Sequence, residues 1–207
     1  LICGYLFSPG QAARAISSAE ALAWIHQPAD TTGEAFIWLH VNLANAATGK
    51  WLRQQFQLSE LFFDALHEGT RSSRIEFADN DLIAVLNDVL YDFSFDASHI
   101  STLWISVDRR LLLSARVKPL RSIDRLRAAV KNGEEFRTPV QLLVHLLRDQ
   151  ADVLMQIVRN SIAQVDDIED RLLAGHLDQR RGQLGKLRRV LVRLQRLLAP
   201  EPAALFR

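Results

Sequence analysis

Imidazole and carboxylate groups occur in one part of the sequence at a spacing suited to metal binding. His145, Asp149 and Asp152 are separated by four and three residues, so in a helix they would lie within about 60° of one another. One imidazole and two carboxylates could hold a zinc ion, and oxygen-rich sites also take magnesium. The alternative is a solvated polar face of an amphipathic helix, because neither a loop of fixed spacing nor a second strand of ligands accompanies these residues.

A second acidic group follows further along the same stretch. It consists of four carboxylates within five residues, Asp166, Asp167, Glu169 and Asp170. Clustered negative charge attracts divalent cations, so this group is a second predicted metal-binding surface. The competing interpretation is an ordinary polar helix face, with Arg171 as its nearest counter-charge.

Basic residues dominate the end of the sequence. Residues 176–207 have a local charge balance of +6, whereas the whole chain of 207 residues has a net charge of only +1. The basic residues are Arg180, Arg181, Lys186, Arg188, Arg189, Arg193, Arg196 and Arg207. A basic helix can pair with an acidic helix, a membrane surface or a nucleic acid. We expect helix pairing and no nucleic-acid binding, because aromatic residues do not alternate with the arginines.

Signatures of common enzyme classes are missing from the sequence. It has no phosphate-binding loop, no Gly-rich dinucleotide turn, no GxSxG and no HExxH. We therefore expect a protein that is not an enzyme and binds no organic cofactor. The single Cys3 excludes a disulfide framework and a zinc site built from cysteines. No run of 18 apolar residues is present, so we expect no membrane span within these residues.

Residues 1–134 are predicted to form an α+β domain with α/β/α layers. Turn residues at 78–80 and 108–110 join neighbouring strands as hairpins, which favours a largely antiparallel sheet flanked by helices. Strands are expected at residues 2–7, 36–41, 73–77, 81–86, 102–107 and 111–116. Helices are expected at residues 12–25, 51–56, 58–66 and 119–130.

Residues 135–207 are predicted to form a second domain, a long antiparallel helical hairpin of coiled-coil type. Thr138 is a good N-cap and Pro139 suits the first helical position. The next glycine is Gly175, so the first helix can extend over about 36 residues, or about 54 Å. Residues spaced near 3.5 apart should form its seam. They are Leu147, Gln150, Leu154, Val158, Ser161, Val165, Ile168 and Leu172, then Leu184, Leu187, Leu191, Leu194 and Leu198 in the second helix.

An ordered series of short motifs gives the sequence a family resemblance. These are Trp38-Leu39-His40-Val41-Asn42, Asp64-Ala65-Leu66 with Gly69-Thr70-Arg71, Lys118 to Asp124, Val165 to Asp170, and Leu187 to Leu191 through Leu198-Ala199-Pro200. Taken in this order, over nearly all of the chain, they resemble the cytoplasmic part of CorA-type metal ion transporters. The resemblance is strongest to the ZntB-like zinc transporter branch, and it lies in the succession of motifs rather than in any one of them.

The resemblance implies a cytoplasmic domain of a divalent cation transporter on the cytoplasmic face of the bacterial inner membrane. Zinc would be the transported or regulatory ion, and the domain would add a cation-attracting funnel and regulation rather than the pore. The resemblance also implies a homopentamer whose subunits each continue into two membrane spans. Both ends of the sequence fall within element patterns, so we expect it to be part of a longer chain. A magnesium or cobalt transporter and a soluble helical-hairpin scaffold are the alternatives.

Overall fold

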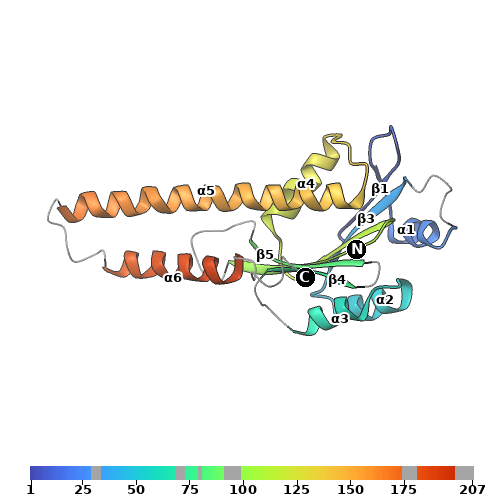
Figure 1. Cartoon of the computed structure of the whole chain (residues 1–207), viewed down its shortest axis with the longest axis horizontal. Coiled ribbons are helices and arrows are strands. Elements are labelled where there is room, and N and C mark those ends of the chain that lie inside the picture. The colour runs from blue at the N-terminus through green and yellow to red at the C-terminus, as the bar shows by residue number, and fades with distance from the viewer. Residues whose placement is uncertain (29–33, 69–72, 79–80, 91–98, 174–180, 199–207) are drawn as a thin grey trace.

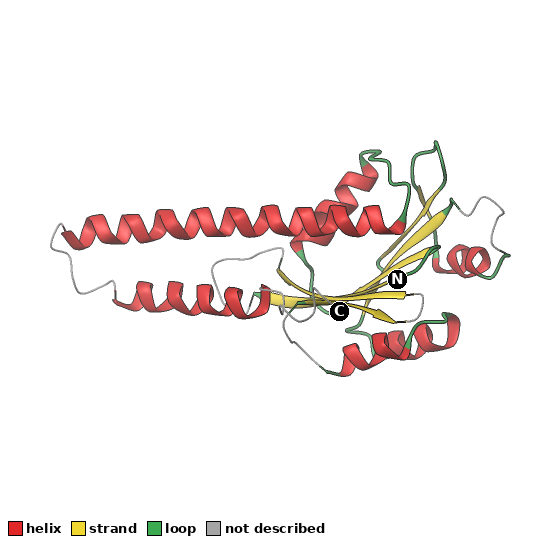
Figure 2. Ribbon diagram, in the orientation of Figure 1, coloured by secondary structure: helices red, strands yellow, loops and turns green. Residues whose placement is uncertain are grey.

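A seven-stranded sheet forms the centre of the molecule, and a long helical hairpin projects from it (Figures 1 and 2). The computed structural model describes residues 1–28, 34–68, 73–78, 81–90, 99–173 and 181–198. The fold is mixed α+β, as predicted. The turn between the two helices of the hairpin lies outside the described residues.

The sheet is mostly antiparallel and has the strand order β2-β1-β3-β7-β6-β5-β4. Its strands are β1 (Cys3–Phe7), β2 (Arg14–Ala15), β3 (Phe36–Asn42), β4 (Arg74–Ala78), β5 (Asp81–Val89), β6 (Ile100–Val107) and β7 (Leu111–Arg116). The two predicted hairpins are confirmed as the antiparallel pairs β4–β5 and β6–β7. Among the strands that the structure describes, only β3 and β7 pair in parallel, with His40 opposite Ser114. This pairing brings together residues that are 74 positions apart in sequence.

Helices cover both faces of the sheet and bury a separate hydrophobic cluster on each. On one face, α1 (Ser18–Ile25), α2 (Ala47–Gln55) and α3 (Glu60–His67) pack on β3 residues such as Leu39. On the other, α4 (Arg121–Lys131) and the first turns of α5 (Pro139–Leu173) pack on Trp38. Both Trp38 and Leu39 are fully buried, so β3 is covered on both faces, as its apolar sequence predicted.

The helix predicted at residues 12–25 is wrong in its first half. Arg14–Ala15 forms the short edge strand β2 beside β1, and α1 starts only after Ser17. The Ser17 side chain accepts a hydrogen bond from Glu20 N, and the Glu20 carboxylate accepts one from Ser17 N. This capping box fixes the start of α1 and leaves the preceding residues free to pair with the sheet.

The long helix is confirmed, but its buried side is rotated from the predicted one. Helix α5 has 35 residues, and α6 (Arg181–Leu198) runs back beside it (Figure 1). Gln150, Ser161 and Ile168 are buried as predicted. Val153 and Ile157 are buried in place of Leu154 and Val158.

The core of the sheet sets this rotation, because the first turns of α5 are part of it. Leu142, Leu143 and Leu146 belong to the same hydrophobic cluster as the sheet and α4. One residue corresponds to about 100° around a helix, so this packing decides which side of α5 faces α6. Leu187 and Val190 are the buried residues among the described side chains of α6. The predicted division into 1–134 and 135–207 stays a prediction.

Candidate functional site

The predicted ligand His145 lies between two carboxylates near the start of α5. Its Nδ1 is 3.1 Å from Glu134 Oε1, and its Nε2 is 3.4 Å from Asp149 Oδ2. Its ring meets the ring of Phe136 edge-on, with 5.2 Å between the centroids. The two carboxylates approach opposite nitrogens of one ring, so in this arrangement they cannot bind the same ion together with one imidazole nitrogen. The third predicted ligand, Asp152, is exposed.

Asp149 is the carboxylate of this group with the most restricted surroundings. Burial raises the pKa of its carboxyl group, and the nearby His145 and Arg125 partly oppose this effect. Its Oδ2 atom is buried and accepts no hydrogen bond from the described residues, since the 3.4 Å approach of His145 Nε2 is an ion-pair contact without hydrogen-bond geometry. A carboxylate oxygen in this condition favours the approach of a positive charge.

The four other predicted ligands lie far from His145, towards the free end of α5. Asp166, Asp167, Glu169 and Asp170 are all exposed. Asp166 follows Asp149 by 17 residues, or about 26 Å of helix. Within the described part of the chain, no three His, Cys, Asp or Glu side chains come close enough to hold a metal ion. The seven-residue ligand set therefore stays a prediction.

Glu134 was missed by the sequence analysis because it belongs to the connection between α4 and α5 rather than to a helix. The sequence signal that could have found it is weak. Glu134 directly follows Gly133, which has a φ of 87° and lies just after the C-cap Asn132 of α4. A reversal at that point returns the chain towards the start of α5, and with it the carboxylate of Glu134.

A buried polar chain fixes α5 to the sheet. Gln150 Nε2 donates to the backbone oxygen of Asn87 in β5 over 2.5 Å. The Asn87 side chain in turn accepts from Thr102 Oγ1 in β6, and its backbone N–H donates to Ser73 Oγ. The projecting helix is thus held by a specific hydrogen bond as well as by apolar packing. Its spacing placed Gln150 in the predicted seam, but its partner Asn87 lies 63 residues earlier in the sequence and could not be predicted.

The next residue of β5, Asp88, holds the N-terminus of α4. Its Oδ2 accepts hydrogen bonds from Ser122 N at 3.0 Å and Ser122 Oγ at 2.5 Å, and its Oδ1 accepts one from Val89 N at 2.8 Å. A carboxylate at a helix N-terminus is favoured by the exposed N–H groups there. Asp88 is fully buried, and burial raises the pKa of its carboxyl group although the three hydrogen bonds act against this.

A second buried polar group connects the parallel strands. Ser114 Oγ accepts from Trp38 Nε1, and His40 Nδ1 lies 2.8 Å from the same oxygen. Arg116 Nε donates to His40 Nε2 over 2.8 Å. The Nε2 atom must therefore be unprotonated and the imidazole neutral. Burial, together with the charge of Arg116, lowers the pKa of His40 to about 3.

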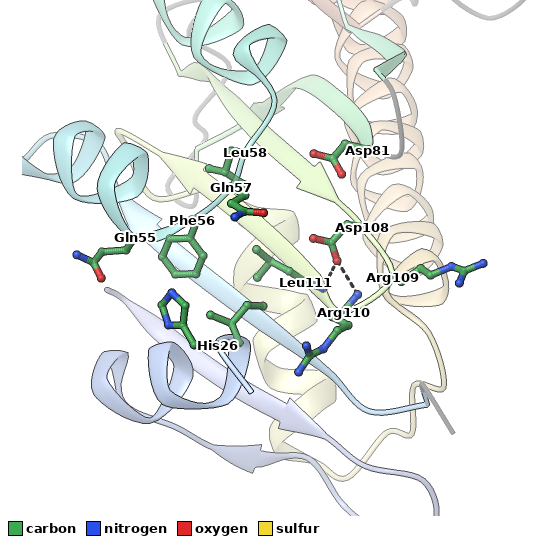
Figure 3. A pocket seen from close by; sticks show the side chains of 11 residues that line it. His26, Gln55, Phe56, Gln57, Leu58, Asp81, Asp108, Arg109, Arg110 and Leu111 are labelled. Atoms are coloured by element: carbon green, nitrogen blue, oxygen red, sulfur yellow. Dashed lines mark hydrogen bonds between the residues drawn. The ribbon is translucent and has the colours of Figure 1, made fainter. Parts of the chain in front are cut away.

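A surface pocket lies on the face of the sheet that α1, α2 and α3 cover. It is bounded by the end of α1, the segment before α3 and the β6–β7 turn (Figure 3). Asp108 Oδ1 accepts from the backbone N–H groups of Arg110 and Leu111. The Arg110 guanidinium donates to two backbone oxygens of the α1 region and lies 4.4 Å from the Trp24 ring. These charged groups therefore stabilise the turn and its contact with α1, and we assign no ligand to the pocket.

Comparison with known proteins gives the family. The model of the family described as "CorA-like Mg2+ transporter protein" matches residues 33–206. The divalent cation transporter CmaX of Pseudomonas aeruginosa is 28% identical over 176 residues, which are 83% of this chain and 52% of CmaX. The zinc transport protein ZntB of Yersinia enterocolitica is 26% identical over 86% of this chain and 54% of its own length. The chain thus spans about half the length of these curated relatives.

Solved structures show the same fold. The structure of full-length CmaX matches 95% of this chain and 59% of its own with a TM-score of 0.80 and 24% identity. The ZntB cytoplasmic domain from Vibrio parahaemolyticus matches 95% of this chain and 73% of its own with a TM-score of 0.67 and 16% identity. A helix long and apolar enough to cross a bilayer does not occur in the part that the structure describes. The chain belongs to the CorA-like family of divalent cation transporters.

Proposed function

We propose that this chain is the cytoplasmic domain of a zinc transporter at the bacterial inner membrane. The observation that carries the proposal is the family match over residues 33–206, which includes the α/β block from β3 onwards and the helical hairpin. The zinc transport protein ZntB is among the relatives, and CmaX is named a divalent cation transporter. The membrane spans and the pore would belong to further parts of the whole protein.

The domain would raise the local cation concentration and respond to bound cations. Helix α5 projects from the block (Figure 1) and carries exposed carboxylates along its length. In a homopentamer, five such helices would combine their charge and attract divalent cations electrostatically. A cation that binds one arrangement of the subunits more tightly than another would shift the population towards that arrangement.

The predicted ligands would then bind cations between subunits rather than within one. His145 and Asp149 form one half-site near the block, and Asp167, Glu169 and Asp170 form another near the free end of α5. Because these carboxylates are exposed or half-buried, we expect micromolar or weaker binding. A group from a second subunit would complete the coordination that one copy lacks.

Magnesium is the alternative cation, and the donor set favours it. The predicted ligands are carboxylates with a single imidazole, and carboxylate oxygens suit Mg²⁺ better than softer metals. The description of the matching family model also names Mg²⁺ as the transported ion. Zinc remains our proposal because the zinc transport protein ZntB is among the curated relatives and the motif succession in the sequence resembles that branch.

Binding of a divalent cation should stabilise the chain against thermal unfolding. At a cation concentration 100 times the dissociation constant, the free energy of unfolding should rise by about 2.7 kcal/mol. The measurement is the melting temperature of the chain with zinc, magnesium or neither. The double variant Asp149→Asn with Asp170→Asn should lose most of the shift. The matched control is Asp64→Asn, which changes an exposed carboxylate of α3 and should keep the shift.

The same measurement separates the transporter domain from a helical-hairpin scaffold. A larger shift with zinc than with magnesium at equal concentration supports the zinc assignment, and the reverse order supports magnesium. Absence of a shift with either cation at millimolar concentration contradicts cation binding by this domain.

A further inference from the structure

Helix α5 has an apolar stripe that no described element covers. Five of its large apolar side chains are between 39% and 56% exposed: Val140, Val144, Met155, Val158 and Ile162. The last three follow the 3–4 spacing of a helix-packing stripe. They lie about 150° around α5 from the buried seam of Val153 and Ile157, so the stripe faces away from that seam.

Helix α6 has an outer face of complementary character. Arg188 and Arg189 are exposed, and Val192 is 38% exposed. Arg189 lies two residues after the buried Leu187, which is about 200° around the helix, so it too points away from the seam. On α5, the exposed Asp166 lies only about 40° from Ile162. Each copy therefore has an outer face on α5 that is apolar, with the exposed Arg159 in its middle and Asp166 towards its free end, and a basic and apolar outer face on α6.

The two charged positions both lie towards the free end of the hairpin. Leu173 ends α5 and Arg181 begins α6 on the same side of the molecule, with α5 reaching further out (Figure 1). Asp166 and Arg189 are each about two turns from the free end of their own helix. A second copy placed alongside in the same direction would bring Asp166 of one copy near Arg189 of the other.

We propose that the outer face of α5, formed by Met155, Val158, Ile162 and Asp166, docks on the outer face of α6, formed by Arg189 and Val192, of a second copy of this chain. The proposal rests on the homo-oligomer of the proposed function and assigns its contact surface. A contact between two different faces is heterologous, and repeated around an axis it can close into a ring. Pairing two α5 faces in the same direction would instead oppose Asp166 to Asp166, which disfavours that symmetric contact.

Cysteine cross-linking of the 207-residue chain tests the pairing of faces. In a Cys3→Ser background, Ile162→Cys combined with Val192→Cys should give a ladder of covalent multimers with a short bismaleimide. Each single cysteine variant should give no covalent dimer, because each would place its thiol opposite a residue without one. The two positions lie on outward faces of one hairpin, so a link within one copy is not expected to compete.

Charge exchange tests the contribution of the ion pair. Asp166→Arg should weaken the ladder at least threefold, and addition of Arg189→Asp to the same chain should restore it. The matched control is Asp64→Arg, which should leave the ladder unchanged. Far-ultraviolet circular dichroism of every variant checks that the helices persist.

The outcomes distinguish this interface from the function on which it rests. Dimers formed by the single Ile162→Cys variant would indicate a symmetric α5 contact and overturn the proposal. Sedimentation showing a monomer at all concentrations, with no ladder, would mean that another segment or protein covers the stripe, and would also overturn it. An oligomer without the ladder would refute this interface and leave the homo-oligomer standing. The cation-induced shift in melting temperature is measured independently of all three.

Discussion

Lowering the pH from 6.5 towards 3 should destabilise the folded chain by about 1.4 kcal/mol per pH unit through His40. Burial and the neighbouring Arg116 lower the pKa of His40 from 6.5 to about 3 in the folded state. The unfolded chain therefore takes up a proton at a pH where the folded chain does not. The stabilising contribution of neutral His40 is fully present above pH 6.5 and is lost progressively as the pH falls through this range.

Urea unfolding at pH 7, 6, 5 and 4 measures this effect when the chain is compared with its His40→Gln variant. Glutamine does not titrate, so the difference in free energy of unfolding between the two proteins should shrink as the pH falls. The comparison is needed because Asp88 and Asp149 have raised pKa values, so these two groups favour the folded state as the pH falls. His26→Gln changes an exposed histidine and serves as the control. Parallel pH profiles for the chain and the His40→Gln variant would contradict the assignment.

The local part of the fold could be predicted from the sequence because its signals are local. Short turns identify the β4–β5 and β6–β7 hairpins, and a long stretch without glycine or proline predicts α5. The parallel pairing of β3 with β7 has no such signal, because α2, α3 and three further strands separate Trp38 from Leu112 in the sequence. The edge strand β2 was missed because an alanine-rich segment favours a helix. The capping box at Ser17 and Glu20, which starts the helix after β2, was not recognised.

The candidate site was only partly predictable for a related reason. Periodicity placed His145 and Asp149 on one side of a helix, and their 3.4 Å approach agrees with that spacing. It could not reveal Glu134, whose position depends on the chain reversal after α4. Nor could it set the rotation of α5, which is decided by Leu142, Leu143 and Leu146 against the sheet. Contacts between distant segments decide these features, and a single sequence carries no direct record of them.

Replacing Asp88 by alanine should lower the free energy of unfolding by about 2–4 kcal/mol, because the change leaves buried hydrogen-bond donors unpaired. Ser122 N, Ser122 Oγ and Val89 N all donate to this carboxylate. Release of a buried charge with a raised pKa offsets part of the cost, which keeps the expected loss below the sum of three hydrogen bonds. Ser122→Ala is the matched control, since it removes the hydroxyl and leaves the carboxylate with its two backbone donors. It should cost about 1 kcal/mol.

Amide hydrogen exchange should show which segments lose stability when Asp88 is replaced. Asn87 and Asp88 are adjacent in β5, and the first holds α5 through Gln150 while the second holds the start of α4. The Asp88→Ala variant should therefore speed exchange of the amides in the first turns of α4 more than those around Gln150. If urea unfolding shows no greater loss for Asp88→Ala than for Ser122→Ala, the carboxylate is not the anchor of α4. If exchange speeds up equally in both helices, α4 and α5 open together as one cooperative unit. A structural change at the start of α4 would then also alter the stability of the projecting helix α5.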